Sequence, residues 1–134
     1  MMKKYVLDSY ALIVYFRKQN GWETVRDLLF EAFQSGQRLQ LTSINWGEVY
    51  YTRLKTGYEE KAEEAIHAIK NMPIDVVEET DTRLAKQAGK YKTLGGIAYA
   101  DCFAAALTKK ENATLVTGDK EFKPLEKEIK ILWI

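Results

Sequence analysis

The sequence contains a single cysteine, Cys102, followed by the apolar residues Phe103 and Ala104. One thiol cannot form a disulfide within the chain, and without a CxxC pair there is no thiolate cage for zinc. We therefore interpret Cys102 as an unreactive thiol in the core. The lack of a disulfide framework favours a reducing compartment, so we expect a cytoplasmic protein.

Long apolar runs are also missing. No segment approaches the roughly eighteen consecutive apolar residues of a membrane-spanning helix, so we expect no association with a membrane. The basic start Lys3-Lys4 precedes an apolar run that Asp8 interrupts, which is too short for the apolar part of a signal peptide. A net charge of +1 does not by itself indicate a nucleic-acid partner. The 134 residues fit one domain, which we expect to span residues 1–134.

Short apolar runs alternate with segments of helical spacing. The runs predict strands at residues 3–7, 38–42, 74–77, 114–117 and 129–133. Strands that alternate with helices, and that are continuously apolar, indicate a parallel sheet covered on both faces. The expected fold is α/β: a three-layer α/β/α sandwich around a parallel sheet of four to five strands.

Polar residues mark where the intervening helices begin. We expect Ser9 to cap the first helix, Ser43 or Asn45 to cap the helix that carries Glu48, and Thr80 or Asp81 to cap a later one. Gly57 is expected to end the helix that carries Glu48.

Four acidic residues, Asp8, Glu48, Asp101 and Asp119, lie within or at the ends of the most apolar segments. A partly buried carboxylate costs free energy unless it is paired, protonated or bound to a cation. Each acid except Asp101 also has an ordinary alternative: a helix cap for Asp8, a helix-dipole partner for Glu48 and a turn residue for Asp119. Asp101 has no such explanation, because it lies among alanines and aromatic residues.

The predicted fold places these acids together. Asp8 and Asp119 each follow a predicted strand, and ligands of open parallel sheets bind beyond the carboxyl ends of the strands. Carboxylates that converge there must retain protons or bind a divalent cation. An all-oxygen site without His or Cys suits Mg²⁺ or Mn²⁺, and such an ion promotes hydrolysis of a phosphodiester. Thr117 and Ser9 are placed to support the carboxylates by hydrogen bonds.

Four segments around these acids resemble the motifs of the PIN-domain family, and within it the VapC-type toxin ribonucleases. They are Tyr5-Val6-Leu7-Asp8-Ser9-Tyr10-Ala11-Leu12, Thr42-Ser43-Ile44-Asn45-Trp46-Gly47-Glu48-Val49, Ala100-Asp101-Cys102-Phe103-Ala104-Ala105-Ala106-Leu107 and Ala113-Thr114-Leu115-Val116-Thr117-Gly118-Asp119-Lys120-Glu121-Phe122. The likeness covers nearly the whole chain, and the last segment is the most specific. The bulky Trp46 before Glu48 departs from the family pattern, in which smaller aliphatic residues are commoner.

The resemblance implies a Mg²⁺- or Mn²⁺-dependent endoribonuclease that acts on RNA. It also implies a homodimer and a cognate antitoxin protein. Asp8, Glu48, Asp101 and Asp119 would be the catalytic, metal-binding acids, with Thr117 in support. An RNA-processing nuclease, or a non-catalytic module that binds RNA or protein, is the alternative.

Two other kinds of site are disfavoured. A phosphatase of the haloacid dehalogenase type requires a second Asp two positions after the first, where this chain has Tyr10. A phospho-accepting receiver domain requires an adjacent acidic pair after the first strand, which is missing. Several aromatic residues are able to stack on unpaired bases, although core or interface roles are commoner for such side chains: Tyr10, Trp46, Tyr50, Tyr51 and Tyr99.

Overall fold

Five parallel strands form the centre of the structure, a computed structural model that describes residues 3–134. The strands are β1 (Tyr5–Leu7), β2 (Leu39–Thr42), β3 (Ile74–Val77), β4 (Thr114–Thr117) and β5 (Lys130–Trp133). Their order across the sheet is β3-β2-β1-β4-β5. The parallel sheet predicted from the sequence is confirmed, with five strands.

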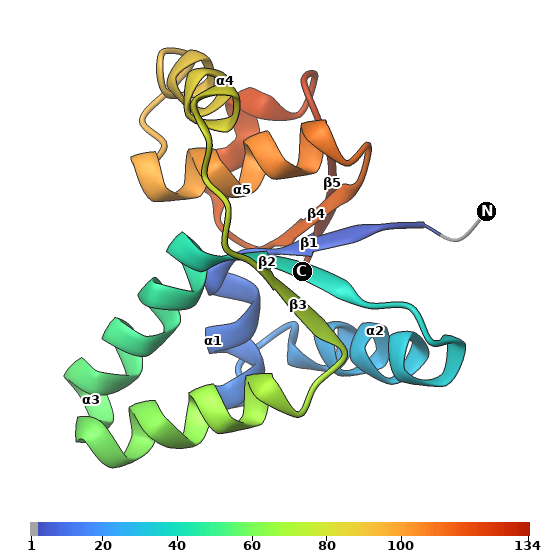
Figure 1. Cartoon of the computed structure of the whole chain (residues 1–134), viewed down its shortest axis with the longest axis vertical. Coiled ribbons are helices and arrows are strands. Elements are labelled where there is room, and N and C mark those ends of the chain that lie inside the picture. The colour runs from blue at the N-terminus through green and yellow to red at the C-terminus, as the bar shows by residue number, and fades with distance from the viewer. Residues whose placement is uncertain (1–2) are drawn as a thin grey trace.

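Helices cover both faces of this sheet (Figure 1). On one face lie α1 (Ser9–Arg17), α2 (Trp22–Ser35) and α3 (Ser43–Lys70), and on the other lie α4 (Thr82–Lys92) and α5 (Tyr99–Lys110). A short 3-10 helix, η1 (Lys120–Leu125), precedes β5. This arrangement confirms the predicted three-layer sandwich.

Neighbouring residues of the central strands supply the two cores. Val6 and Leu115 pack with α4 and α5, whereas Leu7 and Val116 pack with α1, α2 and α3. All four side chains are fully buried. Successive side chains of a strand point to opposite faces, so a continuous apolar run serves both layers at once.

The capping residues of α1 and α3 lie earlier in the chain than the caps predicted for them. The side chain of Asp8, and not that of Ser9, accepts a hydrogen bond from the amide of Ala11 at 2.9 Å. Thr42, and not Ser43 or Asn45, caps α3 by accepting from the amide of Asn45 at 2.9 Å. Both capping residues, Asp8 and Thr42, have the extended backbone of a strand end. Each also has a side-chain oxygen that accepts a hydrogen bond from an amide in the first turn of the helix.

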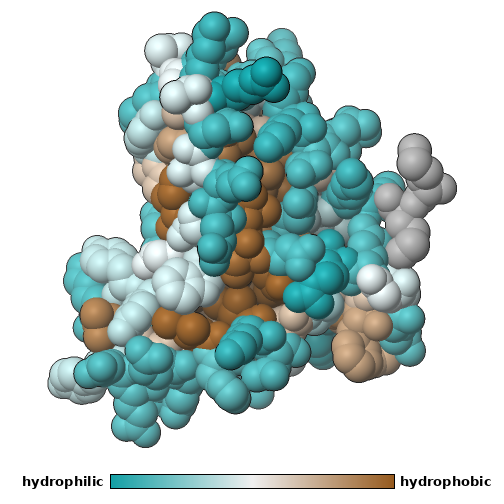
Figure 2. All heavy atoms as spheres, viewed as in Figure 1, coloured by the Kyte–Doolittle hydropathy of each residue, from teal (hydrophilic) through white to brown (hydrophobic). Residues whose placement is uncertain are grey.

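The long helix α3 is divided into two arms at Gly57 and Tyr58, whose backbone is not helical. The predicted break at Gly57 is therefore present, and Tyr58 adopts a positive φ of 61°. An apolar hollow of about 650 Å³ is lined by residues of both arms and of β3, among them Trp46, Ile66 and Val76. Figure 2 shows apolar surface at the centre of this face of the molecule.

No helix within residues 3–134 combines the length and the apolar character needed to cross a membrane.

Candidate metal centre

The acids meet at the carboxyl ends of β1 and β4, which are neighbours in the sheet. The chain order reverses between these strands, because β2 and β3 continue on one side and β5 on the other. Such a switch point is where open α/β sheets bind ligands. Asp8 directly follows β1, and Asp119 lies two residues beyond β4. The helices α3 and α5 bring Glu48 and Asp101 to the same edge, where the charges of Glu48 and Asp119 both act on Asp101.

The side chain of Asp8 is 1% exposed and accepts two hydrogen bonds. One carboxylate oxygen accepts from the amide of Ala11, and the other accepts from the hydroxyl of Thr117. Burial nevertheless raises the pKa of Asp8 from 3.8 to about 8, and the nearby charges of Asp101 and Asp119 add to the increase. Two hydrogen bonds therefore do not compensate for the loss of hydration.

Asp101 lies in the first turn of α5 and is 8% exposed. Burial raises its pKa from 3.8 to about 7, and the carboxylates of Glu48, Asp119 and Glu121 increase it further. Within residues 3–134, the ion pairs formed by basic side chains involve none of these acids. The site therefore gathers carboxyl groups that no basic side chain within residues 3–134 pairs with, and Asp8 and Asp101 retain protons near neutral pH.

Glu48 is held in place by two polar side chains. Its Oε1 atom accepts from the hydroxyl of Ser9 at 3.1 Å and from the amide Nδ2 of Asn45 at 2.8 Å. Asn45 is fully buried, and its Oδ1 accepts from the hydroxyl of Thr42 at 2.7 Å. Both donors bind Oε1, and no hydrogen bond within residues 3–134 is accepted by Oε2.

A group of carboxylates has the spacing needed to hold one cation. Oxygen atoms of Asp101, Asp119 and Glu121 all lie within 4.8 Å of one another. Carboxylate oxygens are the ligands preferred by Mg²⁺ and Mn²⁺, so the chemistry of this donor set fits either ion.

Glu121 was not among the acids selected from the sequence. Its backbone amide donates to Oδ1 of Asp119 at 3.0 Å, and the turn that results brings its own side chain back to the site. In the sequence, the only indication is an acid two positions after Asp119. Glu121 follows a lysine, and such a charged pair is typical of exposed surface, where the structure indeed places it.

The turn between Thr117 and Asp119 is fixed by contacts on both sides. The amide of Asp119 donates to the hydroxyl of Thr117 at 3.0 Å, and this hydroxyl in turn donates to Asp8. Between them Gly118 lies against the ring of Tyr10: a β-carbon on Gly118 would be 2.4 Å from Cε1 of Tyr10 and 2.9 Å from the carbonyl oxygen of Ile134. Gly118 is therefore required for close packing.

Replacing Gly118 with alanine is expected to destabilise the protein by about 1–3 kcal/mol, because either the Tyr10 ring or the Ile134 backbone must move. Urea unfolding measures this change in the free energy of unfolding. Gly89→Ala is the matched control: Gly89 lies inside α4 with no atom within 4 Å of the added carbon, so this change should stabilise the helix. Equal stability of the Gly118→Ala protein and the wild type would contradict the packing argument.

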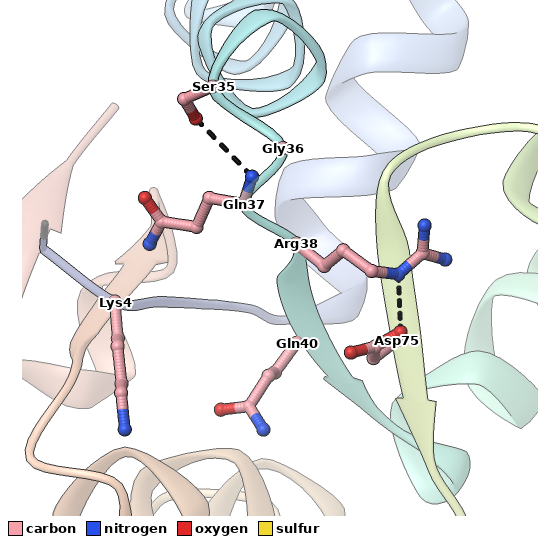
Figure 3. A pocket seen from close by; sticks show the side chains of 7 residues that line it. All are labelled: Lys4, Ser35, Gly36, Gln37, Arg38, Gln40 and Asp75. Carbon is pink, nitrogen blue, oxygen red and sulfur yellow. Dashed lines mark hydrogen bonds and ion pairs between the residues drawn. The ribbon is translucent and has the colours of Figure 1, made fainter.

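The opposite edge of the sheet has a different character. A hollow of about 480 Å³ lies there, lined by residues that include Lys4, Gln40, Arg38 and Asp75 (Figure 3). The acidic residue of this hollow, Asp75, forms an ion pair with Arg38, whose Nε lies 2.5 Å from a carboxylate oxygen of Asp75. This hollow has none of the charge concentration that marks the carboxyl edge.

Solved structures with the same fold include toxin–antitoxin proteins. The chain is similar to VapBC2 from Rickettsia felis, solved with a DNA fragment from its promoter (19% identity, TM-score 0.73, covering 97% of this chain and 98% of that one). It is also similar to DNA-bound VapBC from Salmonella typhimurium (18% identity, TM-score 0.72, 98% of both chains). A further similar structure is VapC20 from Mycobacterium tuberculosis, described as a toxin that cleaves the sarcin-ricin loop (13% identity, TM-score 0.70, 94% and 96% covered).

Comparison with curated protein sequences gave no match. The sequence profile of the PIN domain matches residues 5–128 and so includes every acid of the candidate centre. The chain belongs to the PIN-domain family.

Proposed function

We propose that this protein is a metal-dependent endoribonuclease and the toxin of a VapBC-type toxin–antitoxin pair. The observation that carries the proposal is the group of carboxyl side chains, two of them buried and none paired with a basic side chain within residues 3–134, at the switch point of a PIN fold. A divalent ion bound there would activate water and neutralise charge on a phosphodiester.

The residues take distinct roles in this proposal. Asp101, Asp119 and Glu121 have the spacing to hold the cation, and Asp8, at the end of β1, would add negative charge once a bound cation displaces its proton. Glu48, whose Oε2 accepts no hydrogen bond within residues 3–134, is proposed to extend this set of ligands. Asp8, Glu48, Asp101 and Asp119 are thus proposed as the catalytic, metal-binding acids, with Mg²⁺ or Mn²⁺ as the ion.

Two hydroxyl residues support the acids by hydrogen bonds. Thr117 donates to Asp8 and accepts from the amide of Asp119, so it fixes the acids that follow β1 and β4 relative to each other. Ser9 donates to Glu48 and so connects α1 to α3. Supporting contacts of this kind orient metal ligands.

RNA as the substrate, and an antitoxin as the partner, rest on the likeness to the VapBC proteins. One similar structure is described as a toxin that cleaves the sarcin-ricin loop, and others are VapBC proteins solved with DNA. The apolar hollow between the arms of α3 and the outer edge of β3 offers a surface for a protein partner. The exposed residues Tyr51 and Leu54 on the first arm of α3 support the proposed homodimer.

The proposal is tested by incubating the purified protein with a labelled RNA of mixed single- and double-stranded structure. We expect cleavage with Mn²⁺ or Mg²⁺ and none with EDTA. Cleavage that is unaffected by EDTA would contradict the metal centre.

The toxin role requires a cellular test. Induced expression is expected to arrest growth, and co-expression of the neighbouring reading frame is expected to relieve the arrest. Metal-dependent RNA cleavage without growth arrest would instead support the RNA-processing alternative.

A further inference from the structure

The strand β3 forms one edge of the sheet, and its outer side is open. Within residues 3–134 it pairs with β2 alone and stands last in the order of strands. Its residues Val76 and Val77 are only partly buried. Apolar surface is visible in Figure 2 where Figure 1 places β3. A free strand edge carries backbone groups that are able to pair with another strand, so proteins usually cover or protect such an edge.

The backbone groups of Val76 point away from β2. The amide of Leu39 donates to the carbonyl of Pro73 at 2.8 Å, so Pro73 faces β2. Successive residues of a strand alternate in direction, and Ile74 and Val76 therefore turn their amide and carbonyl groups to the outer side. Arg38 already donates to the carbonyl of Ile74 at 2.8 Å. Within residues 3–134, the amide and the carbonyl of Val76 are thus the central free groups of this edge.

The apolar hollow of about 650 Å³ between the arms of α3 and β3 adjoins this edge. It is lined by Trp46 from the first arm, Ile66 from the second arm and Val76 from β3. The ring of Trp46 packs edge-on against Tyr50, with 6.1 Å between the ring centroids. The hydroxyl of Tyr50 donates to Glu63 of the second arm at 3.1 Å, which connects the two arms. The hollow is therefore a preformed apolar surface beside a free strand edge.

Charges of opposite sign lie at the two ends of this hollow. Arg38 and Lys70 line it at the amino end of β3, and Glu78 lines it directly after the carboxyl end. Lys70 and Glu78 are both exposed, and neither forms an ion pair within residues 3–134. The surface along β3 therefore changes from basic to acidic in the direction of the strand.

This surface is complementary to a second copy of itself. If two β3 strands pair antiparallel with Val76 opposite Val76, these residues exchange both of their free backbone hydrogen bonds. Ile74 then lies opposite Glu78 of the second copy, so the basic end of each hollow meets the acidic end of the other. A two-fold axis through this pair leaves α3 of both copies on the same face of the joined sheet, and the two apolar hollows adjoin.

We infer that β3 and the adjoining hollow form the homodimer interface of this protein, through which one continuous sheet runs across two copies of the chain. The inference deepens the homodimer named in the proposed function, and it requires neither RNA cleavage nor a bound metal. The paired strands run in opposite directions, so the two carboxyl edges, each with its own acids, lie at opposite ends of the joined sheet.

Sedimentation velocity of the full-length protein over a range of concentrations measures the dissociation constant of the dimer. Lys70→Glu and Glu78→Lys each place like charges opposite each other at two symmetric positions. We expect either change to raise the dissociation constant by about 5- to 50-fold. The double variant restores opposite charges and should return the dissociation constant to near the wild-type value. Lys86→Glu is the matched control, because Lys86 is exposed on α4, outside the hollow.

Hydrogen exchange tests the pairing of the strands directly. The amide of Val76 should exchange slowly at protein concentrations above the dissociation constant and rapidly below it, because it is hydrogen-bonded only in the dimer. In the Lys70→Glu protein, rapid exchange should persist to higher concentrations. Urea unfolding at low concentration identifies any variant whose loss of dimer is due to instability.

The outcomes separate this inference from the proposed function. A dimer that both charge reversals leave unchanged, but that Leu54→Glu dissociates, would move the interface to the first arm of α3 and overturn the pairing through β3. Failure of the double variant to restore the dimer would also overturn it. A monomer that instead binds the product of the neighbouring reading frame, with this binding weakened by Lys70→Glu, would assign the hollow to that partner. Dimerisation through β3 without metal-dependent RNA cleavage would refute the nuclease proposal and leave this inference intact.

Discussion

Asp101→Asn is expected to lower metal-dependent RNA cleavage by on the order of 10³-fold or more while the fold is retained. Asp101 belongs to the group of carboxylates whose oxygens lie within 4.8 Å of one another, and the charges of Glu48, Asp119 and Glu121 all act on it. An amide has nearly the same shape as a carboxyl group but cannot supply the negative charge that a divalent ion requires. Cleavage rates at saturating Mn²⁺ measure the effect.

The fold should survive this change because asparagine removes a source of repulsion. Burial and neighbouring carboxylates already disfavour the charged form of Asp101, so a neutral side chain should keep or raise the stability without metal. Asp27→Asn is the matched control: its side chain is 70% exposed on α2 and, within residues 3–134, forms an ion pair only with the adjacent Arg26. Full activity of the Asp101→Asn protein would eliminate the proposed metal centre.

The sequence was sufficient to predict the layers and the edge at which the acids lie. The apolar strands β1 and β4 serve two cores at once, and this requirement appears in the sequence as uninterrupted runs such as Tyr5-Val6-Leu7. Asp8 follows β1 directly and Asp119 lies two residues beyond β4, so the position of each was fixed by the position of the strand. The resemblance then assigned Glu48 and Asp101 to the same edge, and of these two the structure places Asp101 in the group of three carboxylates with ion-binding spacing.

The details that the sequence did not reveal depend on side-chain geometry over short distances. Whether Asp8 or Ser9 caps α1 depends on which residue keeps the extended backbone, and adjacent polar residues compete for that role. Asn45 was considered as a cap, yet it is buried and directs its amide at Glu48. Glu121 joins the group of carboxylates only because a turn bonded to Asp119 redirects the chain.

The stability of the metal-free protein is expected to fall by several kcal/mol as the pH rises from about 4 to about 8. The folded protein holds protons on Asp8 and Asp101 up to pKa values of about 8 and about 7, whereas their ordinary value is 3.8. Across this window the unfolded chain releases protons that the folded chain retains, so each rise in pH favours unfolding. Below the window both states are protonated, and the contribution to stability is fully present.

A divalent cation should reverse this loss, because it binds the ionised carboxylates of the folded state only. At a free concentration one hundred times the dissociation constant it adds about 2.7 kcal/mol, and the gain should be larger at pH 8 than at pH 5. Urea unfolding across this pH range, with EDTA or with Mn²⁺, measures both effects.

The Asp8→Asn protein keeps a side-chain oxygen for the cap of α1 but has one ionising group fewer, so its metal-free pH dependence should be shallower. If the free energy of unfolding depends equally on pH in the two proteins, Asp8 has an ordinary pKa. A bound cation would then not be needed for Asp8 to ionise at neutral pH.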